Sequence, residues 1–326
     1  MDIFELSQRG GLYAALSSLG HIIEETTVKD QLMIRITSPS GRVWMSGSKM
    51  AYPMNNHYVH QIADNKQLSY ELANRLGIHI PHTMYVNRGT DIDQIRLFMS
   101  QYSEVIIKPL DSYKSRGVTL EVDTNEALTD ALEDAYKFSP TAIIQEQVRG
   151  EEYRFTILEG EIVSVLRRER PQVQGDGTST ISQLVERENT LRRSSGARGA
   201  DYPQWTDELM GASVRSDHVL NKDEVRLLST TTMVSQGASA YELADEVDDS
   251  YMQVATTFAA TLGAGLSAID MFIVDHTAPA AQGGYWFNEC NTSPSLKMYS
   301  LARNADASWV ADKIVNATHR HLNISV

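Results

Sequence analysis

Residues 268–273 read Ala-Ile-Asp-Met-Phe-Ile, and residues 288–294 read Asn-Glu-Cys-Asn-Thr-Ser-Pro. The first stretch is an apolar strand interrupted by Asp270, whose carboxylate would be costly to bury without a partner. Glu289 and Asn291 are two residues apart, so both face the same side of an extended segment. A hairpin between the two stretches would bring these three oxygen-bearing side chains together, and such a set suits magnesium. The spacing alone also allows a second interpretation, in which Asp270 is salt-bridged and Glu289 lies in an exposed turn.

A second signal is a lysine near the end of a buried strand. Residues 105–109 read Val-Ile-Ile-Lys-Pro, and Pro109 ends this short apolar strand. A turn-rich loop follows at residues 111–117, and residues 118–122 are its expected partner strand. Amide groups in such a loop can hold phosphate oxygens while Lys108 supplies a positive charge. The alternative is that Lys108 is a solvated residue at a strand edge.

The rest of the chain alternates between helical and extended patterns, which predicts a mixed α/β or α+β fold. We expect helices at residues 10–20, 65–76, 125–136, 180–188, 250–262 and 307–319. We expect further strands at residues 32–36, 142–147, 153–158, 162–167, 267–274 and 284–289. Residues 192–205 are rich in Arg, Ser and Gly, which favours a mobile loop that could close over a site.

The composition favours a soluble, cytoplasmic protein that binds neither nucleic acid nor membrane. The 326 residues carry a net charge of −13, so the chain lacks the basic surface that contacts phosphate backbones. The single cysteine, Cys290, fits a reducing compartment and should be a small buried residue. The N-terminus carries Asp2 and Glu5 where a signal peptide would be basic and then apolar. Residues 256–274 could span a bilayer by length, but they contain Asp270, so we interpret them as a helix and a buried strand.

Several sequence blocks, in the same order, resemble those of the ATP-grasp ligases over about residues 60–300. The blocks are residues 62–66 with 77–81 (first lysine), 106–111 with 116–118 (second lysine and phosphate loop), 145–154 (adenine hinge and ribose segment), 167–181 (an Arg-to-Gly-Asp-Gly stretch), and 268–270 with 288–294 (metal-binding strands). They are most similar to the ATP-grasp domains of cyanophycin synthetases and bifunctional glutathione synthetases. The metal-binding strands are also similar to those of D-alanine–D-alanine ligases.

This resemblance implies roles for individual residues. Lys66 and Lys108 would contact the ATP phosphates, and Arg168 would face the transferring phosphoryl group or the acyl phosphate, so Lys108 and Arg168 are the implied catalytic residues. The other implied nucleotide-binding residues are Ser112, Ser115, Arg116 and Gly117 in the phosphate loop, Gln145, Glu146 and Val148 at the adenine hinge, and Glu152 at the ribose. Asp270, Glu289 and Asn291 would hold Mg²⁺, or Mn²⁺ in its place. Gln145 stands where the family has an acid.

The implied fold class is α+β, an ATP-grasp fold in which two α/β subdomains hold ATP between them. A short N-terminal region at residues 1–62 would precede an ATP-grasp domain at residues 63–326, with a smaller lobe at about 83–148 and a catalytic lobe at about 149–326. The implied activity joins a small-molecule carboxylate to an amine through an acyl phosphate and releases ADP and phosphate. An amino acid or a small peptide is the expected substrate.

Two other functions stay open at this point, namely an ATP-grasp kinase for a small molecule and a non-catalytic ATP-binding subunit. The formation of a homo-oligomer is open as well. Four arginines could bind the substrate carboxylate, and the sequence does not choose among Arg154, Arg167, Arg192 and Arg193.

Overall fold

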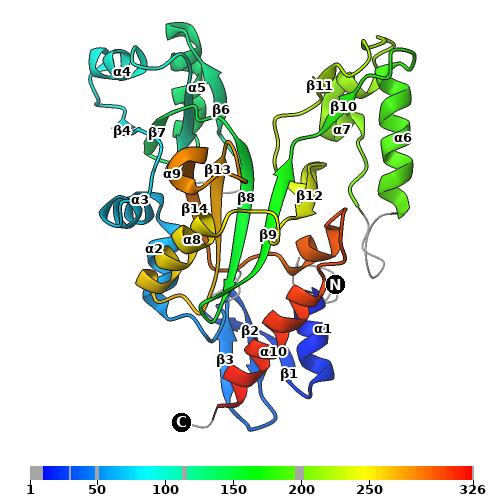
Figure 1. Cartoon of the computed structure of the whole chain (residues 1–326). Coiled ribbons are helices and arrows are strands. Elements are labelled where there is room, and N and C mark those ends of the chain that lie inside the picture. Colours follow the sequence, from blue (N-terminus) through cyan, green and yellow to red (C-terminus); the bar gives the residue numbers. More distant parts are fainter. Residues whose placement is uncertain (1–9, 29–30, 48–50, 112–115, 195–201, 325–326) are drawn as a thin grey trace.

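The strands of the described residues form four β-sheets, as the computed structural model in Figure 1 shows. The structure describes residues 10–28, 31–47, 51–111, 116–194 and 202–324. A central body carries two projections at the upper end of Figure 1, one with α4, α5 and β4–β7 and the other with α6, α7, β10 and β11. The N-terminal sheet and the C-terminal helix lie together at the lower end.

The central sheet is antiparallel and has the strand order β12-β9-β8-β13-β14. Its strands are β8 (Glu151–Leu158), β9 (Glu161–Glu169), β12 (Ser239–Glu242), β13 (Leu266–Ile273) and β14 (Tyr285–Asn291). Helices α2 (His57–Asp64), α3 (Lys66–Arg75) and α8 (Asp249–Leu262) share one apolar core with these strands. The short helix α9 (Ala280–Gly283) connects β13 to β14. The register places Asp270 of β13 beside Arg154 of β8 and Glu289 of β14.

The first projection is a small lobe built on a four-stranded antiparallel sheet, with the order β4-β7-β5-β6. Its strands are β4 (Thr83–Asn87), β5 (Val105–Pro109), β6 (Thr119–Val122) and β7 (Thr141–Glu146). Helices α4 (Ile92–Met99) and α5 (Asn125–Tyr136) share an apolar core with this sheet. The lobe continues into the central sheet through the short connection between β7 and β8.

The second projection is an arm with its own apolar core. It contains the two-stranded sheet of β10 (Gln172–Gln174) and β11 (Val225–Leu227), the helices α6 (Ile181–Ser194) and α7 (Asp207–Met210), and the 3-10 helix η2 (Gly211–Arg215). The 3-10 helix η3 (Val234–Gln236) follows the arm and leads to β12. The arm therefore interrupts the central sheet between β9 and β12.

The lower end joins the two ends of the described chain. The sheet β1-β2-β3 comprises β1 (Ile22–Val28), β2 (Gln31–Thr37) and β3 (Val43–Ser46). Apolar residues of this sheet pack in one core with α1 (Gly10–Ser18), the 3-10 helix η4 (Leu296–Leu301) and α10 (Trp309–Asn323). The same core includes Leu158, Leu166 and Leu266 of the central sheet, so this end is continuous with the body.

Most elements expected from the sequence are confirmed. The six expected helices correspond to α1, α3, α5, α6, α8 and α10, and the expected strands correspond to β2, β5, β6, β7, β8, β9, β13 and β14. Residues 256–274 form the end of α8 and all of β13, as expected. Within the described part of the chain, no helix combines the length and the apolar character needed to cross a membrane.

The expected mobile loop at residues 192–205 is wrong at both ends. Arg192 lies in α6 and is almost fully buried, with its guanidinium stacked over the rings of Trp205 and Tyr202 at 4.5 and 4.8 Å. It donates hydrogen bonds to Glu188 and to the Pro203 carbonyl. Charge pairing and ring stacking therefore fix a segment whose composition is typical of a loop. Residues 195–201 lie outside the described residues.

Candidate active site

The central sheet separates its residues into a charged face and an apolar face. Successive side chains of a strand point to opposite faces, and neighbouring strands here place their charged residues in register. The charged face carries Glu152 and Arg154 of β8, Arg168 of β9, Asp270 of β13, and Glu289 and Asn291 of β14. The alternate residues Tyr153, Phe155, Ile269 and Met271 belong to the apolar core shared with α8. The alternation of charged and apolar residues along these strands therefore places the charged side chains together on one face of the sheet.

Asp270 is fully buried and is bound by two arginines. Arg154 donates from Nε to Oδ1 at 2.7 Å and from Nη2 to Oδ2 at 2.6 Å, and Arg168 donates from Nη2 to Oδ2 at 2.7 Å. Burial alone would raise the pKa of Asp270, but the two guanidinium groups reverse this effect and hold the pKa below its ordinary value. The nearest partners of Asp270 are thus two arginines, as the salt-bridged interpretation expected. The carboxylate stays ionised in the interior.

Arg168 is shared between two buried carboxylates. Its Nη2 atom donates to Glu152 Oε1 at 2.5 Å as well as to Asp270, and Asn288 Nδ2 donates to the same Glu152 oxygen at 3.3 Å. Burial raises the pKa of Glu152, and Arg168 opposes that rise. The Nε atom of Arg168 is also buried, and it has no hydrogen-bond acceptor among the described residues. A buried donor without a partner is uncommon in folded proteins and here is available to a ligand oxygen.

Glu289 and Asn291 lie together at the open edge of the charged face. Asn291 Nδ2 donates to Glu289 Oε1 at 2.9 Å, and Arg154 Nη2 approaches the same oxygen at 4.0 Å. The Glu289 side chain is 37% exposed, in contrast to Asp270 on the neighbouring strand. The alternative of an isolated turn residue is therefore wrong for Glu289, which lies on β14 directly opposite Asp270.

The donor set at this edge fits a hard cation such as Mg²⁺. It consists of two carboxylates and one amide, and Mg²⁺ is usually bound through one or two carboxylates together with substrate phosphates and water. No cluster of three or more His, Cys, Asp or Glu side chains suited to a metal ion occurs in the described ranges.

Two lysines approach the charged face, Lys66 from α3 and Lys108 from β5 of the small lobe. Lys66 is the first residue of α3, because the Asn65 side chain caps the helix by accepting from the Leu68 amide. Burial lowers the pKa of Lys66, Glu289 opposes this shift, and Lys108 adds to it. Lys108 on β5 is also buried, so the solvated-edge interpretation is wrong. Burial lowers the pKa of Lys108 to about 8, and Glu289 and Glu152 oppose the shift.

The residues expected at the adenine hinge are arranged in two different ways. The Gln145 side chain points inward and accepts a hydrogen bond from Lys108 Nζ at 2.9 Å. Glu146 ends β7, where its Oε1 atom accepts from the His82 amide at 2.9 Å and its own amide donates to the His82 carbonyl. Val148 lies in the connection between β7 and β8, which joins the small lobe to the central sheet. Only the segment around Glu146 and Val148 thus has the position of a hinge.

The expected phosphate loop is described in part. Ser112 and Ser115 lie outside the described residues. Gly117 has a φ of +70°, and a Cβ atom there would lie 2.5 Å from the Phe138 ring, so only glycine fits. The Arg116 guanidinium lies over the same ring at 5.1 Å. Phe138 therefore fixes the end of the loop that leads into β6.

The structure separates the four arginines that could bind a substrate carboxylate. Arg154 lies on the charged face, whereas Arg167 lies on the opposite face over the Tyr241 ring and pairs with Glu151 and Glu169. Arg192 is enclosed by the arm, and Arg193 pairs with Glu186 on the surface of α6. Sequence reasoning missed Tyr70, which contacts both Lys108 and Gln145. Its position four residues after Lys66 on a helix could have indicated it, because such residues share a face.

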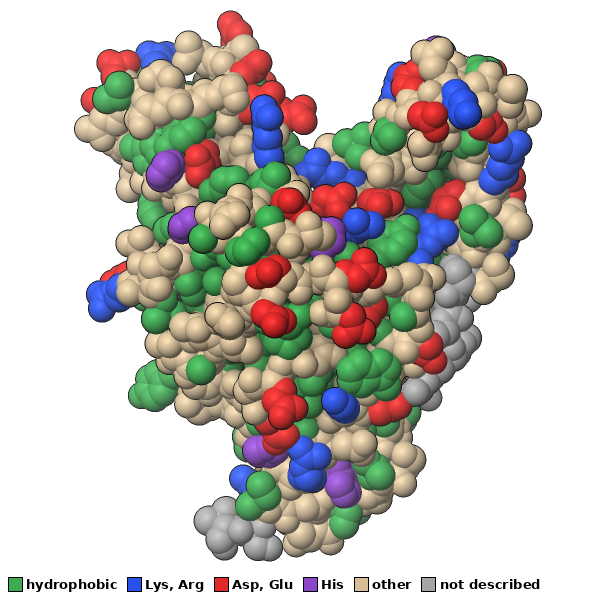
Figure 2. Space-filling model, in the orientation of Figure 1, with side chains coloured by type: hydrophobic (Ala, Val, Ile, Leu, Met, Phe, Trp, Pro, Cys, Tyr) green, Lys and Arg blue, Asp and Glu red, His purple; other side chains and the backbone are tan. Residues whose placement is uncertain are grey.

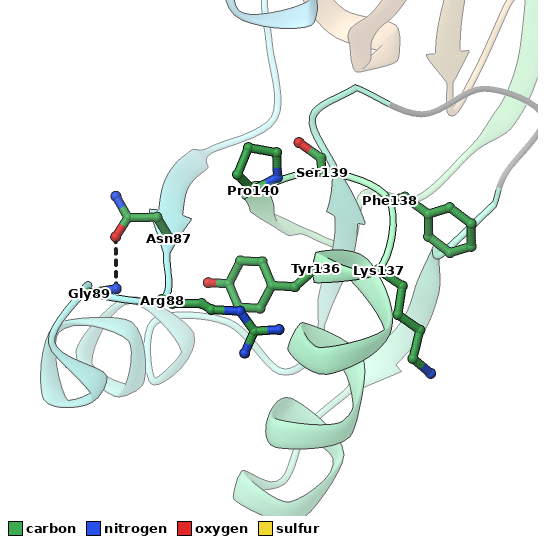
Figure 3. Close-up of a pocket in the computed structure, with 8 residues that line it drawn as sticks. All are labelled: Asn87, Arg88, Gly89, Tyr136, Lys137, Phe138, Ser139 and Pro140. Carbon is green, nitrogen blue, oxygen red and sulfur yellow. Dashed lines mark hydrogen bonds between the residues drawn. The ribbon is translucent and has the colours of Figure 1, made fainter.

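The molecule is hollowed between its two projections, above the charged face. Figure 2 shows Lys, Arg, Asp and Glu side chains gathered on the floor of this notch. A separate hollow of about 620 Å³ lies on the small lobe, between the end of β4 and the α5–β7 connection (Figure 3). Its basic residues are already paired, Arg88 with Glu133 and Lys137 with Asp134, and no residue predicted for the site lines it. The notch, and not this hollow, contains the candidate site.

In comparison with known proteins, this arrangement is similar to the ATP-grasp fold, which confirms the resemblance and the fold class inferred from the sequence. The chain superposes on a bifunctional glutathione synthetase from Pasteurella multocida with a TM-score of 0.64 and 21% identity, over 96% of this chain and 44% of that one. No protein-family model matches the chain.

Two curated relatives have similar sequences over most of this chain. It is 28% identical over 257 residues to the glutathione biosynthesis bifunctional protein GshAB of Enterococcus faecalis, covering 75% of this chain and 34% of that protein. It is 25% identical over 247 residues to a cyanophycin synthetase of Trichormus variabilis, covering 73% of this chain and 27% of that protein. The chain therefore spans about a third of the length of the curated relatives it matches.

Proposed function

We propose that this chain is an ATP-dependent carboxylate–amine ligase that activates its acid as an acyl phosphate and releases ADP and phosphate. The observation that carries the proposal is the meeting of Lys66 and Lys108 with the charged face of the central sheet. Both lysines interact electrostatically with Glu289, and Lys108 also with Glu152. Glu289 in turn lies opposite Asp270, which pairs with Arg168. This arrangement can bind a polyanion on one side and a divalent cation on the other.

The proposed roles are those that the resemblance to ATP-grasp ligases implies, and the charge and burial of the residues are compatible with them. Lys66 and Lys108 would bind ATP phosphates, and Glu146, Val148 and Glu152 would contact the adenosine. Asp270, Glu289 and Asn291 would hold Mg²⁺, with Mn²⁺ able to replace it. When bound, the metal would neutralise negative charge on the phosphate oxygens.

Arg168 is the proposed stabiliser of the transferring phosphoryl group. Phosphoryl transfer depends mainly on positioning and on stabilising charge, and the unpartnered Nε atom of Arg168 supplies a buried donor for a phosphoryl oxygen. A buried donor is worth more than one in water because it is already oriented and solvent does not compete with it. The amine would then attack the acyl phosphate and release phosphate.

The substrates proposed are amino acids or small peptides, free in the cytoplasm. The support comes from the relatives, one named for glutathione biosynthesis and one a cyanophycin synthetase. Of the four candidate arginines, Arg154 is the one favoured for the substrate carboxylate, because it lies on the charged face beside Glu289.

A paired-substrate screen tests this proposal. Phosphate release is measured with ATP and Mg²⁺ over amino acids and dipeptides, singly and in pairs, and products are identified by mass spectrometry. Release that requires both an acid and an amine, with an amide product, is the expected result. A phosphorylated single substrate would instead indicate the kinase, and ATP binding without turnover on any pair would indicate the non-catalytic subunit.

A further inference from the structure

Lys108 is held in place by a neutral amide and not by a carboxylate. Its Nζ atom donates to Gln145 Oε1 at 2.9 Å and approaches the Tyr70 hydroxyl at 3.5 Å. All three side chains are buried. No ion pair of Lys108 within 4 Å occurs among the described residues, although the sheet that faces it is rich in acids.

The orientation of the Gln145 amide is determined by its surroundings. Its Nε2 atom donates to the Thr83 hydroxyl at 2.8 Å and to the Tyr70 hydroxyl at 3.2 Å. An ammonium group can only donate, so the atom facing Lys108 has to be the amide oxygen. Three strands and one helix thus contribute to a network in which every partner of the lysine is uncharged.

We infer that Gln145 is a positioning residue, whose side-chain oxygen aims the Lys108 ammonium at the ATP phosphates without neutralising its charge. The inference rests on the proposed function, because it assigns the lysine to phosphate. A carboxylate at the same place would form a buried ion pair with Lys108. It would then neutralise part of the positive charge that could otherwise act on the ATP phosphates. The amide gives the same direction to the side chain and leaves the whole charge for the nucleotide.

This arrangement should link ATP binding to proton uptake. The charged and titratable groups around Lys108 are Lys66 and Tyr70 on α3, Glu152 on β8 and Glu289 on β14. Burial raises the pKa of Tyr70 to about 12, so Tyr70 stays neutral. With the pKa of Lys108 at about 8, the free protein loses this charge in mildly alkaline solution. ATP binds the protonated form, so its affinity should fall above that pH.

The test compares the wild type with Gln145→Glu and with a matched control, Gln94→Glu. Gln94 lies exposed on α4 of the same lobe, so the control adds the same charge away from Lys108. Two quantities are measured from pH 6.5 to 10: the titration of Lys108 by NMR with ¹³C-labelled lysine, assigned with Lys108→Arg, and the affinity for ATP by calorimetry.

Gln145→Glu should raise the pH at which Lys108 titrates by about one unit or more, which corresponds to a tenfold change in its proton affinity. It should weaken ATP binding at pH 7 by roughly tenfold. The remaining affinity should begin to fall at a higher pH than in the wild type. Gln94→Glu should match the wild type in both measurements. A Gln145→Glu protein with wild-type titration, or with a shifted titration and unchanged ATP affinity, would overturn the inference alone. A wild type that binds no ATP would overturn the proposed function as well.

Discussion

The two faces of the central sheet are made from alternate residues of the same strands, yet they depend on different interactions. On the apolar face, Phe155, Ile269 and Met271 gain stability from being removed from water. On the charged face, Arg154, Arg168 and Asp270 replace their hydrogen bonds to water with hydrogen bonds to one another. Such buried ion pairs often contribute little net stability. The difference teaches that the apolar face stabilises the fold, whereas the charged face, which contains the proposed ligand-binding residues, contributes little to stability.

The largest combined effect on stability and turnover should come from Asp270→Ala. The comparison is with Ile269→Ala, a change at the adjacent residue on the apolar face. Removing Asp270 leaves the buried Arg154 without its acceptor and Arg168 with Glu152 alone, so the free energy of unfolding should fall by about 3–5 kcal/mol. Ile269→Ala should cost about 2–5 kcal/mol through the cavity it creates. Urea unfolding and phosphate release distinguish the faces, because only the Asp270 change should also abolish turnover.

Asp270→Asn serves as a milder form of this comparison, since it keeps the shape and removes the charge. Wild-type turnover in folded Asp270→Asn protein, or loss of turnover in folded Ile269→Ala protein, would break the division between the two faces.

Next in size is Glu289→Gln, which should lower kcat by on the order of a thousandfold, or ~4 kcal/mol, with little change in stability. Glu289 is partly exposed and its replacement is nearly isosteric, so folding should not depend on its charge. Turnover against Mg²⁺ concentration and nucleotide affinity by calorimetry are the measurements. Normal turnover of the variant at ordinary Mg²⁺ concentration would show that Glu289 is not a metal ligand, and would contradict the proposed metal site.

The smallest effect concerns Lys108→Met, which should lower kcat/KM for ATP about a hundredfold, a loss of ~2.7 kcal/mol. It should also change how stability depends on pH. Burial lowers the pKa of Lys108 in the folded state to about 8, whereas an unfolded lysine titrates near ~10.4. The charged lysine therefore opposes folding below pH ~8, and this penalty disappears as the pH rises through ~10.4.

The wild type should accordingly gain roughly 2–3 kcal/mol over Lys108→Met between pH 7 and pH ~11. Urea unfolding of both proteins across that range checks the sign. Parallel curves for the two proteins would mean that Lys108 is not held in a buried site.

The charged face could be predicted in part from the sequence because its residues follow the two-residue period of a strand. Asp270 inside an apolar run and the Glu289–Asn291 spacing are local signals. The partnership of Asp270 with Arg154 is not, because 116 residues separate them and the register of β8 against β13 decides it. The resemblance indicated Gln145 as a nucleotide contact, but its inward orientation depends on Tyr70 and Thr83, which lie far away in the sequence.

The arm shows a different reason for failure. The composition around Arg192 is typical of a loop. Glu188 is a local partner, four residues earlier, but nothing local indicates that Trp205 and Ser239 would enclose the side chain. The weakly patterned strands β1 and β3 escaped prediction because much of their surface is exposed, so the alternation of apolar and polar residues is faint.

The shared core of the N-terminal sheet and α10 has a consequence for how the protein folds during synthesis. Ile34 and Ile36 of β2 are buried with Val310 and Ile314 of α10, at the other end of the described chain. Contacts between such distant segments form slowly, because a long loop has to close first. On the ribosome, β2 is made before α10, so their contacts cannot form until α10 has emerged. Throughout that interval the apolar side of β2 remains exposed to chaperones and to other nascent chains.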